Sequence, residues 1–275
     1  MNTSLDLDIG GLALRFALPP GWLPPLRERY AAFLTAQPPG WSVTVEEGPV
    51  AVAESDAWIR HDGPVTYFAV PGVVGWINLA TKAAQIRTPV AGRAWSAIER
   101  TASYILMEAL PREQAALWLH ACGVVLGGRG HVFFGASGAG KTTVARLAAG
   151  HAELLCDENV VLRPASGGPE LFSTPFWGHS TPPELIRRVN RRAPLAALYQ
   201  LTHAADFSVT RLDPADAVAA LLGTEKVATE RVESALAWLA AADGLVACVP
   251  VYRLGFRPTV ELWDFLATVP AAHPA

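Results

Sequence analysis

The chain has 275 residues, of which 51% are hydrophobic and 17% charged, with a formal net charge of −3 and a pI of about 6.2. This composition excludes an intrinsically disordered chain and is typical of a globular protein. No block rich in Lys and Arg is present, so nothing indicates binding to nucleic acid or to an anionic membrane. The N-terminus lacks the pattern of a secretion signal, and the apolar runs are too short to span a bilayer. We therefore expect a cytoplasmic protein.

The three cysteines, Cys122, Cys156 and Cys248, are odd in number and show no C-x-x-C spacing. This pattern argues against a disulfide framework or a zinc site, and favours reduced thiols that are mostly buried.

The first part of the chain, residues 1–91, reads as a β-rich α+β module. Alternating apolar residues predict strands within 1–18, and a proline-flanked segment predicts a short helix from Leu26 to Thr35. Further short β-like runs cover residues 42–47, 51–54, 65–70 and 75–80.

Residues 92–118 read as connecting helices. Apolar residues at helical spacing predict a helix from residue 92 that ends before Pro111, followed by a shorter helical piece over 113–120. From about residue 119 the order becomes strand, glycine-rich turn, strand, helix and strand, which is typical of an α/β domain. Two more amphipathic helices are predicted at 214–223 and 231–244.

The most specific motif is G-x-x-x-x-G-K-T, which lies between the strand-like run HVFF and the helical run KTTVARLAA. In this context the motif predicts a phosphate-binding loop, because glycines let backbone N–H groups surround phosphate oxygens. Lys141 is expected to reach the β- and γ-phosphates of a nucleotide, and the Thr142 hydroxyl to bind Mg²⁺. The predicted nucleotide-binding residues are Gly135, Ala136, Ser137, Gly138, Ala139, Gly140, Lys141, Thr142 and Thr143.

An acidic pair follows soon afterwards, because the apolar run of residues 152–156 ends in Asp157 and Glu158. Open α/β sheets place ligands at the carboxyl ends of their strands, so this pair predicts a magnesium-directing strand. We expect one acid to face the metal and the other to face the attacking nucleophile. A solvated acidic turn is the alternative.

His120 stands at the start of a predicted hairpin. With a four-residue loop from Gly127 to Gly130, counting pairs along the hairpin places His120 opposite Ser137, inside the phosphate-binding loop. A histidine there can stabilise transferring charge or take part in proton transfer. A structural histidine that caps the preceding helix is the alternative, and His131, at the far end of the hairpin, is expected to be structural.

The segment from Leu119 to Leu147, together with LLCDENVVL (154–162), resembles the HPr serine kinase/phosphorylase family and its HPr-kinase-related subgroup. This family shares its nucleotide-binding core with ATP-dependent phosphoenolpyruvate carboxykinases. Looser likeness extends through STPFWGHS (173–180) to about residue 258. The resemblance implies an α/β fold in which residues 92–275 form a P-loop kinase-like domain beside the smaller N-terminal module.

By this resemblance, ATP and Mg²⁺ are the cofactors, and the catalytic residues are His120, Lys141, Asp157 and Glu158, with Thr142 and Asp157 as metal ligands. The acceptor would be a serine-type hydroxyl on a protein or peptide. The family's usual Asp-Asp pair is Asp-Glu here, and a glycine-rich segment linked to phosphorylase activity has no clear counterpart.

Other kinds of nucleotide-binding protein fit less well, because the chain has neither the N-K-x-D motif of GTPases nor the signature of ABC-type ATPases. A non-catalytic nucleotide sensor or assembly module and a small-molecule kinase remain alternatives. The arginines of ELIRRVNRRAP (184–194) have helical spacing and suggest either a solvated helix face or a lid that binds phosphate. The sequence leaves the oligomeric state open, including a homo-oligomer.

Overall fold

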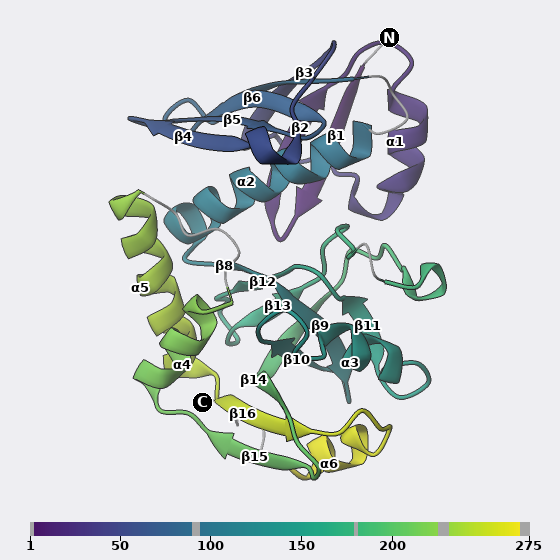
Figure 1. Ribbon diagram of the computed structural model, residues 1–275, viewed down its shortest axis with the longest axis vertical. Helices are drawn as coiled ribbons and strands as arrows, with labels where there is room; N and C mark the ends of the chain where they lie inside the picture. Colours follow the sequence, from purple (N-terminus) through teal and green to yellow (C-terminus); the bar gives the residue numbers. More distant parts are fainter. Residues whose placement is uncertain (1–2, 90–93, 179–180, 225–230, 270–275) are drawn as a thin grey trace. The chain divides into compact units, whose positions relative to one another are not determined.

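The computed structural model describes residues 3–89, 94–178, 181–224 and 231–269. The chain forms a mixed α/β structure with two sheets, divided between two compact units, Met1–Ala109 and Leu110–Ala275 (Figure 1). The division falls within helix α2 (Ala94–Gln114), whereas the sequence analysis placed it after residue 91.

The first half of α2 belongs to the N-terminal unit because its side chains pack there. Glu99 accepts hydrogen bonds from Arg29, at 2.9 Å, and from the Tyr30 hydroxyl, at 3.0 Å. Tyr104 meets the Phe68 ring edge-on, with 5.0 Å between ring centroids. These contacts join α2 to α1 (Leu23–Arg29) and to the sheet of the same unit.

The N-terminal unit holds a seven-stranded sheet in the order β1-β2-β3-β7-β6-β5-β4. Strands β1 and β3 show the alternating burial expected for a sheet with one face on a core. The strands are β1 (Ser4–Ile9), β2 (Leu12–Ala17), β3 (Trp41–Glu47), β4 (Trp58–Asp62), β5 (Val65–Val70), β6 (Val73–Asn78) and β7 (Ala83–Thr88).

The second unit holds a nine-stranded sheet. Its path is β11-β9-β10-β14-β13-β12-β8, with β16 beside β14 and β15 beside β16. The strands are β8 (Leu117–Leu119), β9 (Ala121–Leu126), β10 (Arg129–Phe134), β11 (Glu153–Cys156), β12 (Val160–Arg163), β13 (Glu170–Phe172), β14 (Arg192–His203), β15 (Ser208–Arg211) and β16 (Val251–Phe256).

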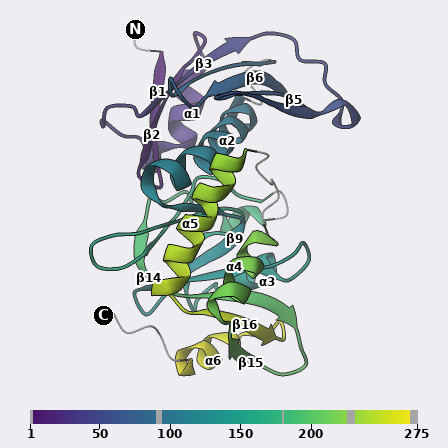
Figure 2. The ribbon, with the colours of Figure 1, turned by 90° about the vertical axis from the view of Figure 1, so that its left-hand side faces the viewer.

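Helices cover both faces of this second sheet. Apolar side chains of α3 (Lys141–Leu147) and α6 (Leu262–Thr268) share one core cluster with Phe133 and Tyr199. The other cluster contains side chains of α4 (Pro214–Leu222) and α5 (Val232–Cys248) with Phe134 and Leu198. Figure 2 turns α4 and α5 toward the viewer, in front of the strands. Neighbouring residues of β10 and β14 thus face opposite cores, as strand geometry requires.

The directions of the strands place several chain turns at one edge of the sheet. Strand β10 runs parallel to β14, which runs parallel to β16. Strands β10 and β11 are both antiparallel to β9, which lies between them, so they run in the same direction. The carboxyl ends of β10, β11, β14 and β16 therefore lie along the same edge, where open α/β sheets bind ligands.

Several predicted elements are confirmed, among them the strands within 1–18 and helices α4 and α5, but four local predictions are wrong. Residues 51–53 form no strand, and the predicted helix from Leu26 to Thr35 ends early, at Arg29, before a short 3₁₀ turn (Ala31–Phe33). Helix α2 continues past Pro111 to Gln114, because its apolar face stays buried around the proline. Residues 117–119 form strand β8, paired with β12, instead of a helix.

His131 lies within β10, and burial beside Arg129 lowers its pKa to about 4. Its ring stacks on Tyr199, with 5.9 Å between centroids, and only 8% of the residue is exposed. The folded protein therefore keeps His131 neutral where the unfolded chain, with an ordinary pKa near 6.5, takes up a proton. Stability should fall as the pH drops from about 6.5 toward 4.

We expect His131→Phe, which keeps the aromatic stack, to remove this acid sensitivity. Between pH 7.5 and pH 5, the free energy of unfolding of the wild type should fall by about 2 kcal/mol more than that of the variant. Urea unfolding of both proteins at the two pH values measures the difference. Equal losses in the two proteins would show that His131 does not titrate in this way.

Candidate functional site

The predicted phosphate-binding loop joins β10 to α3. Lys141, the first residue of α3, is 8% exposed, and its Nζ donates to the carbonyl oxygens of Gly135, at 2.8 Å, and of Ala136, at 3.3 Å. A turn closed by the Ala139 N–H and the Ala136 carbonyl, 3.0 Å apart, shapes the loop between them. The lysine thus holds a buried positive charge against the loop's own backbone, while Thr142 and Thr143 are half-buried in the next positions.

Asp157 follows the last residue of β11 and is almost fully buried, with 3% of its surface exposed. Its Oδ2 accepts a hydrogen bond of 2.6 Å from the Thr181 hydroxyl, and its Oδ1 accepts one of 3.4 Å from the Gly178 N–H. Burial raises the pKa of the carboxyl group, while these two hydrogen bonds act in the opposite direction. The solvated acidic turn considered from the sequence does not describe Asp157.

Glu158 and His120 form a second, more accessible pair. Oε1 of Glu158 lies 3.5 Å from Nδ1 of His120, and the two side chains are 30% and 12% exposed. Their backbones are also linked, because the Ala121 N–H donates to the Glu158 carbonyl oxygen at 3.2 Å. The structure therefore brings together His120 and the acidic turn, which the sequence analysis placed in one cluster.

The predicted register that placed His120 opposite Ser137 is wrong. Leu126 pairs with Arg129, and Phe134 pairs with Ala121, so the turn has two residues instead of four. Gly127 and Gly128 have φ angles of 57° and 79°, which allow the two-residue turn that suits a twisted hairpin. Continuing this register places residue 120 opposite Gly135, the first residue of the loop. His120 also follows strand β8 and caps no helix.

The buried thiol of Cys122 is affected by the charges of both Asp157 and Lys141. Burial raises the pKa of this thiol, the charge of Asp157 raises it further and the charge of Lys141 lowers it, so both charged groups act on the same buried thiol. Burial raises the pKa of Cys156 to about 11, and its Sγ donates to the Phe176 carbonyl oxygen at 2.7 Å. Both thiols are thus protonated packing groups, as the sequence analysis expected, whereas Cys248 is exposed.

Sequence reasoning missed His203, at the carboxyl end of β14. Its Nε2 lies 3.0 Å from the Gly138 carbonyl oxygen, and its ring stacks on Phe256 with 6.2 Å between centroids. Phe256 also packs closely against Gly140, because a Cβ atom added at this glycine would lie 2.6 Å from Cζ of the ring. The last residues of β14 and β16 therefore support the loop from the side opposite the acidic turn.

Residues 173–194 contain the STPFWGHS segment and the arginine-rich run noted in the sequence. Phe176 is buried and meets the Trp118 ring edge-on at 5.4 Å, so this aromatic residue packs in the interior. His179 and Ser180 lie outside the described residues. The arginine-rich run is not a helix beyond a short 3₁₀ turn (Pro183–Leu185). Arg191 pairs with Glu153 at 2.8 Å, and Arg192 lies 3.5 Å from Glu170.

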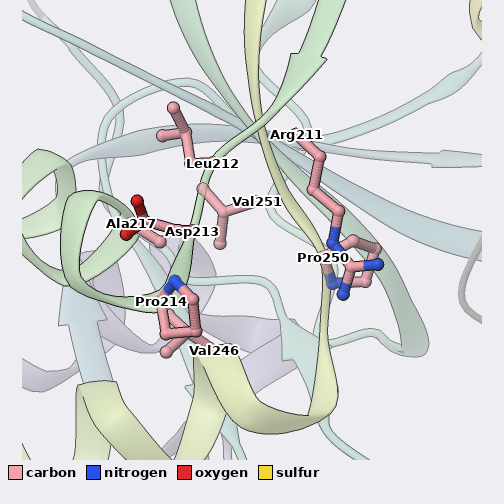
Figure 3. A pocket seen from close by; sticks show the side chains of 8 residues that line it. All are labelled: Arg211, Leu212, Asp213, Pro214, Ala217, Val246, Pro250 and Val251. Atoms are coloured by element: carbon pink, nitrogen blue, oxygen red, sulfur yellow. The ribbon is translucent and has the colours of Figure 1, made fainter.

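A cavity of about 350 Å³ lies elsewhere in the second unit, where β15 leads into α4 (Figure 3). Arg211 and Asp213 lie on either side of an apolar floor that includes Pro214 and Val251. Val251 begins β16, whereas Phe256 ends it beside the loop. The cavity is therefore at the opposite end of that strand from the predicted phosphate-binding site.

Two findings concern whether the residues of the candidate site could bind a metal ion. Among the described residues, no group of three or more His, Cys, Asp or Glu side chains is arranged to hold one. Thr142 and Asp157 instead offer oxygen ligands, which suit Mg²⁺, an ion that is usually held by one or two protein groups with phosphates and water. Asp157 keeps acceptor capacity for it, because a carboxylate has about four lone-pair sites and two are used here.

A family model described as "ScmC: SynChlorMet cassette protein ScmC" matches residues 94–269, well over half of the chain. The chain belongs to this family. The ScmC region begins with α2 and contains every candidate site residue, from His120 through the loop to Asp157 and Glu158. The strands of the N-terminal unit lie outside it.

No curated protein matches the chain. Among solved structures, the chain is similar to the HPr(Ser) kinase/phosphatase from Coxiella burnetii, at 14% sequence identity and a TM-score of 0.30. The match covers 55% of this chain and 87% of that chain. A likeness this weak assigns no function. No helix among the described residues has the length and apolar character of a membrane span.

Proposed function

We propose that the chain is an HPr-kinase-like P-loop kinase that transfers the γ-phosphoryl group of ATP to a serine-type hydroxyl of a protein or peptide. The observation that carries this proposal is that two sets of functional residues lie along the same edge of the sheet. The loop with its buried lysine follows β10, and the Asp157–Glu158 turn with His120 follows β11.

Each part has a role in phosphoryl transfer, which depends mainly on positioning and on stabilising charge. The amides of residues 135–140 and the ammonium group of Lys141 would bind the phosphates. Thr142 and Asp157 would hold Mg²⁺, which when bound neutralises charge on the phosphate oxygens. Glu158, the more exposed carboxylate, would accept the proton of the acceptor hydroxyl. His120, 3.5 Å away, would orient Glu158 and stabilise the transferring charge.

Transfer of label from γ-³²P-ATP tests the reaction. Purified protein with Mg²⁺ is incubated with a library of serine-containing peptides, and a phosphoserine product is expected. The description of the family as cassette proteins directs the search for an acceptor to proteins of the same cassette. Binding of ATP without transfer to any hydroxyl would instead support a nucleotide sensor, and label on a metabolite alone would support a small-molecule kinase.

We expect Glu158→Gln to lower the rate of transfer by about 100- to 1,000-fold, because the variant loses the proton acceptor but keeps the side-chain shape. ATP affinity should stay within about twofold of wild type, since Glu158 is assigned no contact with the nucleotide. Glu153→Gln is the matched control, because Glu153 begins β11, the strand that leads into the acidic turn, and is 43% exposed. Full activity in Glu158→Gln would contradict the assignment of Glu158 as the base.

A further inference from the structure

The segment that comprises residues 173–178 and Thr181 is bound closely to the acidic turn of residues 156–159. Two of its residues hold the backbone and the thiol of the turn, since the Thr174 hydroxyl donates to the Asn159 carbonyl oxygen at 2.6 Å and the Phe176 carbonyl accepts from Cys156 at 2.7 Å. The other two bonds go to the Asp157 carboxylate itself. The carboxylate is thus held by a part of the chain more than twenty residues away in sequence.

The two donors to Asp157 are linked to each other by a backbone hydrogen bond. The Thr181 N–H bonds the Gly178 carbonyl at 3.1 Å, which brings the Gly178 N–H and the Thr181 hydroxyl to the two oxygens of one carboxylate. Thr181 and Asp157 are 6% and 3% exposed, so water does not compete for the bond between them. A hydroxyl–carboxylate distance of 2.6 Å is typical of a strong, charge-assisted hydrogen bond.

The space between Gly178 and the acidic turn is also tightly filled. A Cβ atom added at Gly178 would lie 2.8 Å from Oε2 of Glu158 and 3.3 Å from the Thr181 hydroxyl. Because Gly178 has no side chain, its backbone can approach both Asp157 and Glu158 at once. Each oxygen of Asp157 accepts a hydrogen bond from one of these two linked donors, and together the two bonds favour one rotation of the side chain.

We infer that Thr181 is a positioning residue that orients the Asp157 carboxylate for binding the divalent cation of a metal–nucleotide complex. This inference rests on the proposed function, in which Asp157 is a metal ligand. Donors behind a ligating carboxylate set its orientation, and their loss typically weakens metal binding by about 10- to 100-fold. The Thr181 hydroxyl has one proton to donate, and it donates that proton to Oδ2.

Three variants separate orientation of the ligand from general stability. Thr181→Val removes the hydroxyl and keeps the shape, and Thr181→Ser restores the hydroxyl. Thr174→Val is the matched control, because it removes a buried hydroxyl from the same segment that bonds the backbone of the turn and not the carboxylate. Binding of Mn²⁺ to the full-length protein saturated with a non-hydrolysable ATP analogue is measured by electron paramagnetic resonance, and urea unfolding reports stability.

Thr181→Val should bind Mn²⁺ in this complex at least about tenfold more weakly, with Thr181→Ser close to wild type. Thr174→Val should lose stability but keep its Mn²⁺ affinity. Wild-type affinity in Thr181→Val, or an equal loss in Thr174→Val, would overturn the inference and leave the kinase proposal intact. Failure of the wild type to bind the Mn²⁺–nucleotide complex at all would overturn both.

Discussion

Replacing Lys141 with alanine is expected to reduce phosphoryl transfer by about 1,000-fold, the upper range for losing one preorganised group that stabilises transferring charge. The ammonium group is buried and already bonded to the loop at Gly135 and Ala136, so under the proposed function it would contribute both positive charge near the phosphates and order in the loop. ATP affinity should fall as well, because both contributions act on the bound nucleotide. Steady-state transfer from labelled ATP and calorimetric titration with the nucleotide measure the two effects.

Arg146→Ala provides the control for Lys141→Ala. Arg146 lies in the same helix and is exposed, so its replacement removes one positive charge without touching the loop. Its transfer rate should stay within about twofold of wild type, as expected for an exposed charge outside the site. Circular dichroism and urea unfolding establish that Lys141→Ala is folded, and a folded variant with wild-type activity would refute a kinase that uses this loop.

Gly140→Ala is expected to weaken nucleotide binding by about 100-fold, a loss of the size that a displacement of about 1 Å produces in a positioned site. The residue has φ of 113°, and an added Cβ would lie 2.6 Å from Cζ of Phe256. Phe256 is 1% exposed and packed in the core, so the loop must move and not the ring. Isothermal titration with ATP and Mg²⁺ measures the loss.

Gly138→Ala separates this collision from backbone strain alone. Gly138 also has a positive φ, of 81°, but a Cβ there meets nothing within 4 Å. The only free-energy cost expected for Gly138→Ala is therefore that of placing a non-glycine residue in this backbone conformation, roughly 1–2 kcal/mol. If Gly138→Ala and Gly140→Ala weaken binding equally, the close packing of Phe256 against the loop has no part in nucleotide binding.

Local patterns in the sequence predicted those parts of the site whose structure depends on residues close together in the sequence. The strand, loop and helix of residues 131–147 were recognisable because the glycine motif, the apolar run and the helix-forming residues all agree. The acidic turn was recognisable for the same reason, since Asp157 and Glu158 directly follow a buried strand. Which of the two acids is buried could not be predicted, because that depends on Gly178 and Thr181.

The errors arose where several conformations fit the same residues. The apolar run Leu117–Leu119 is too short for periodicity to distinguish a helix from a strand, and its pairing with β12 decides the outcome. The hairpin register depended on whether Gly127-Gly128 or a longer loop makes the turn. The bond between Thr181 and Asp157 joins residues 24 positions apart, with no motif at either end that indicates the other.

The position of β9 has a consequence for how the site is assembled. Because β9 runs against both neighbours, it begins where β10 and β11 end, and the residue just before it is His120. Two strand spacings, roughly 10 Å, separate β10 from β11, and residue 120 lies just before the strand between them, with its Nδ1 3.5 Å from Oε1 of Glu158. The turn formed by Gly127 and Gly128 at the far end of the hairpin sets this register, so its length determines which residue of the loop from Gly135 to Gly140 lies opposite His120.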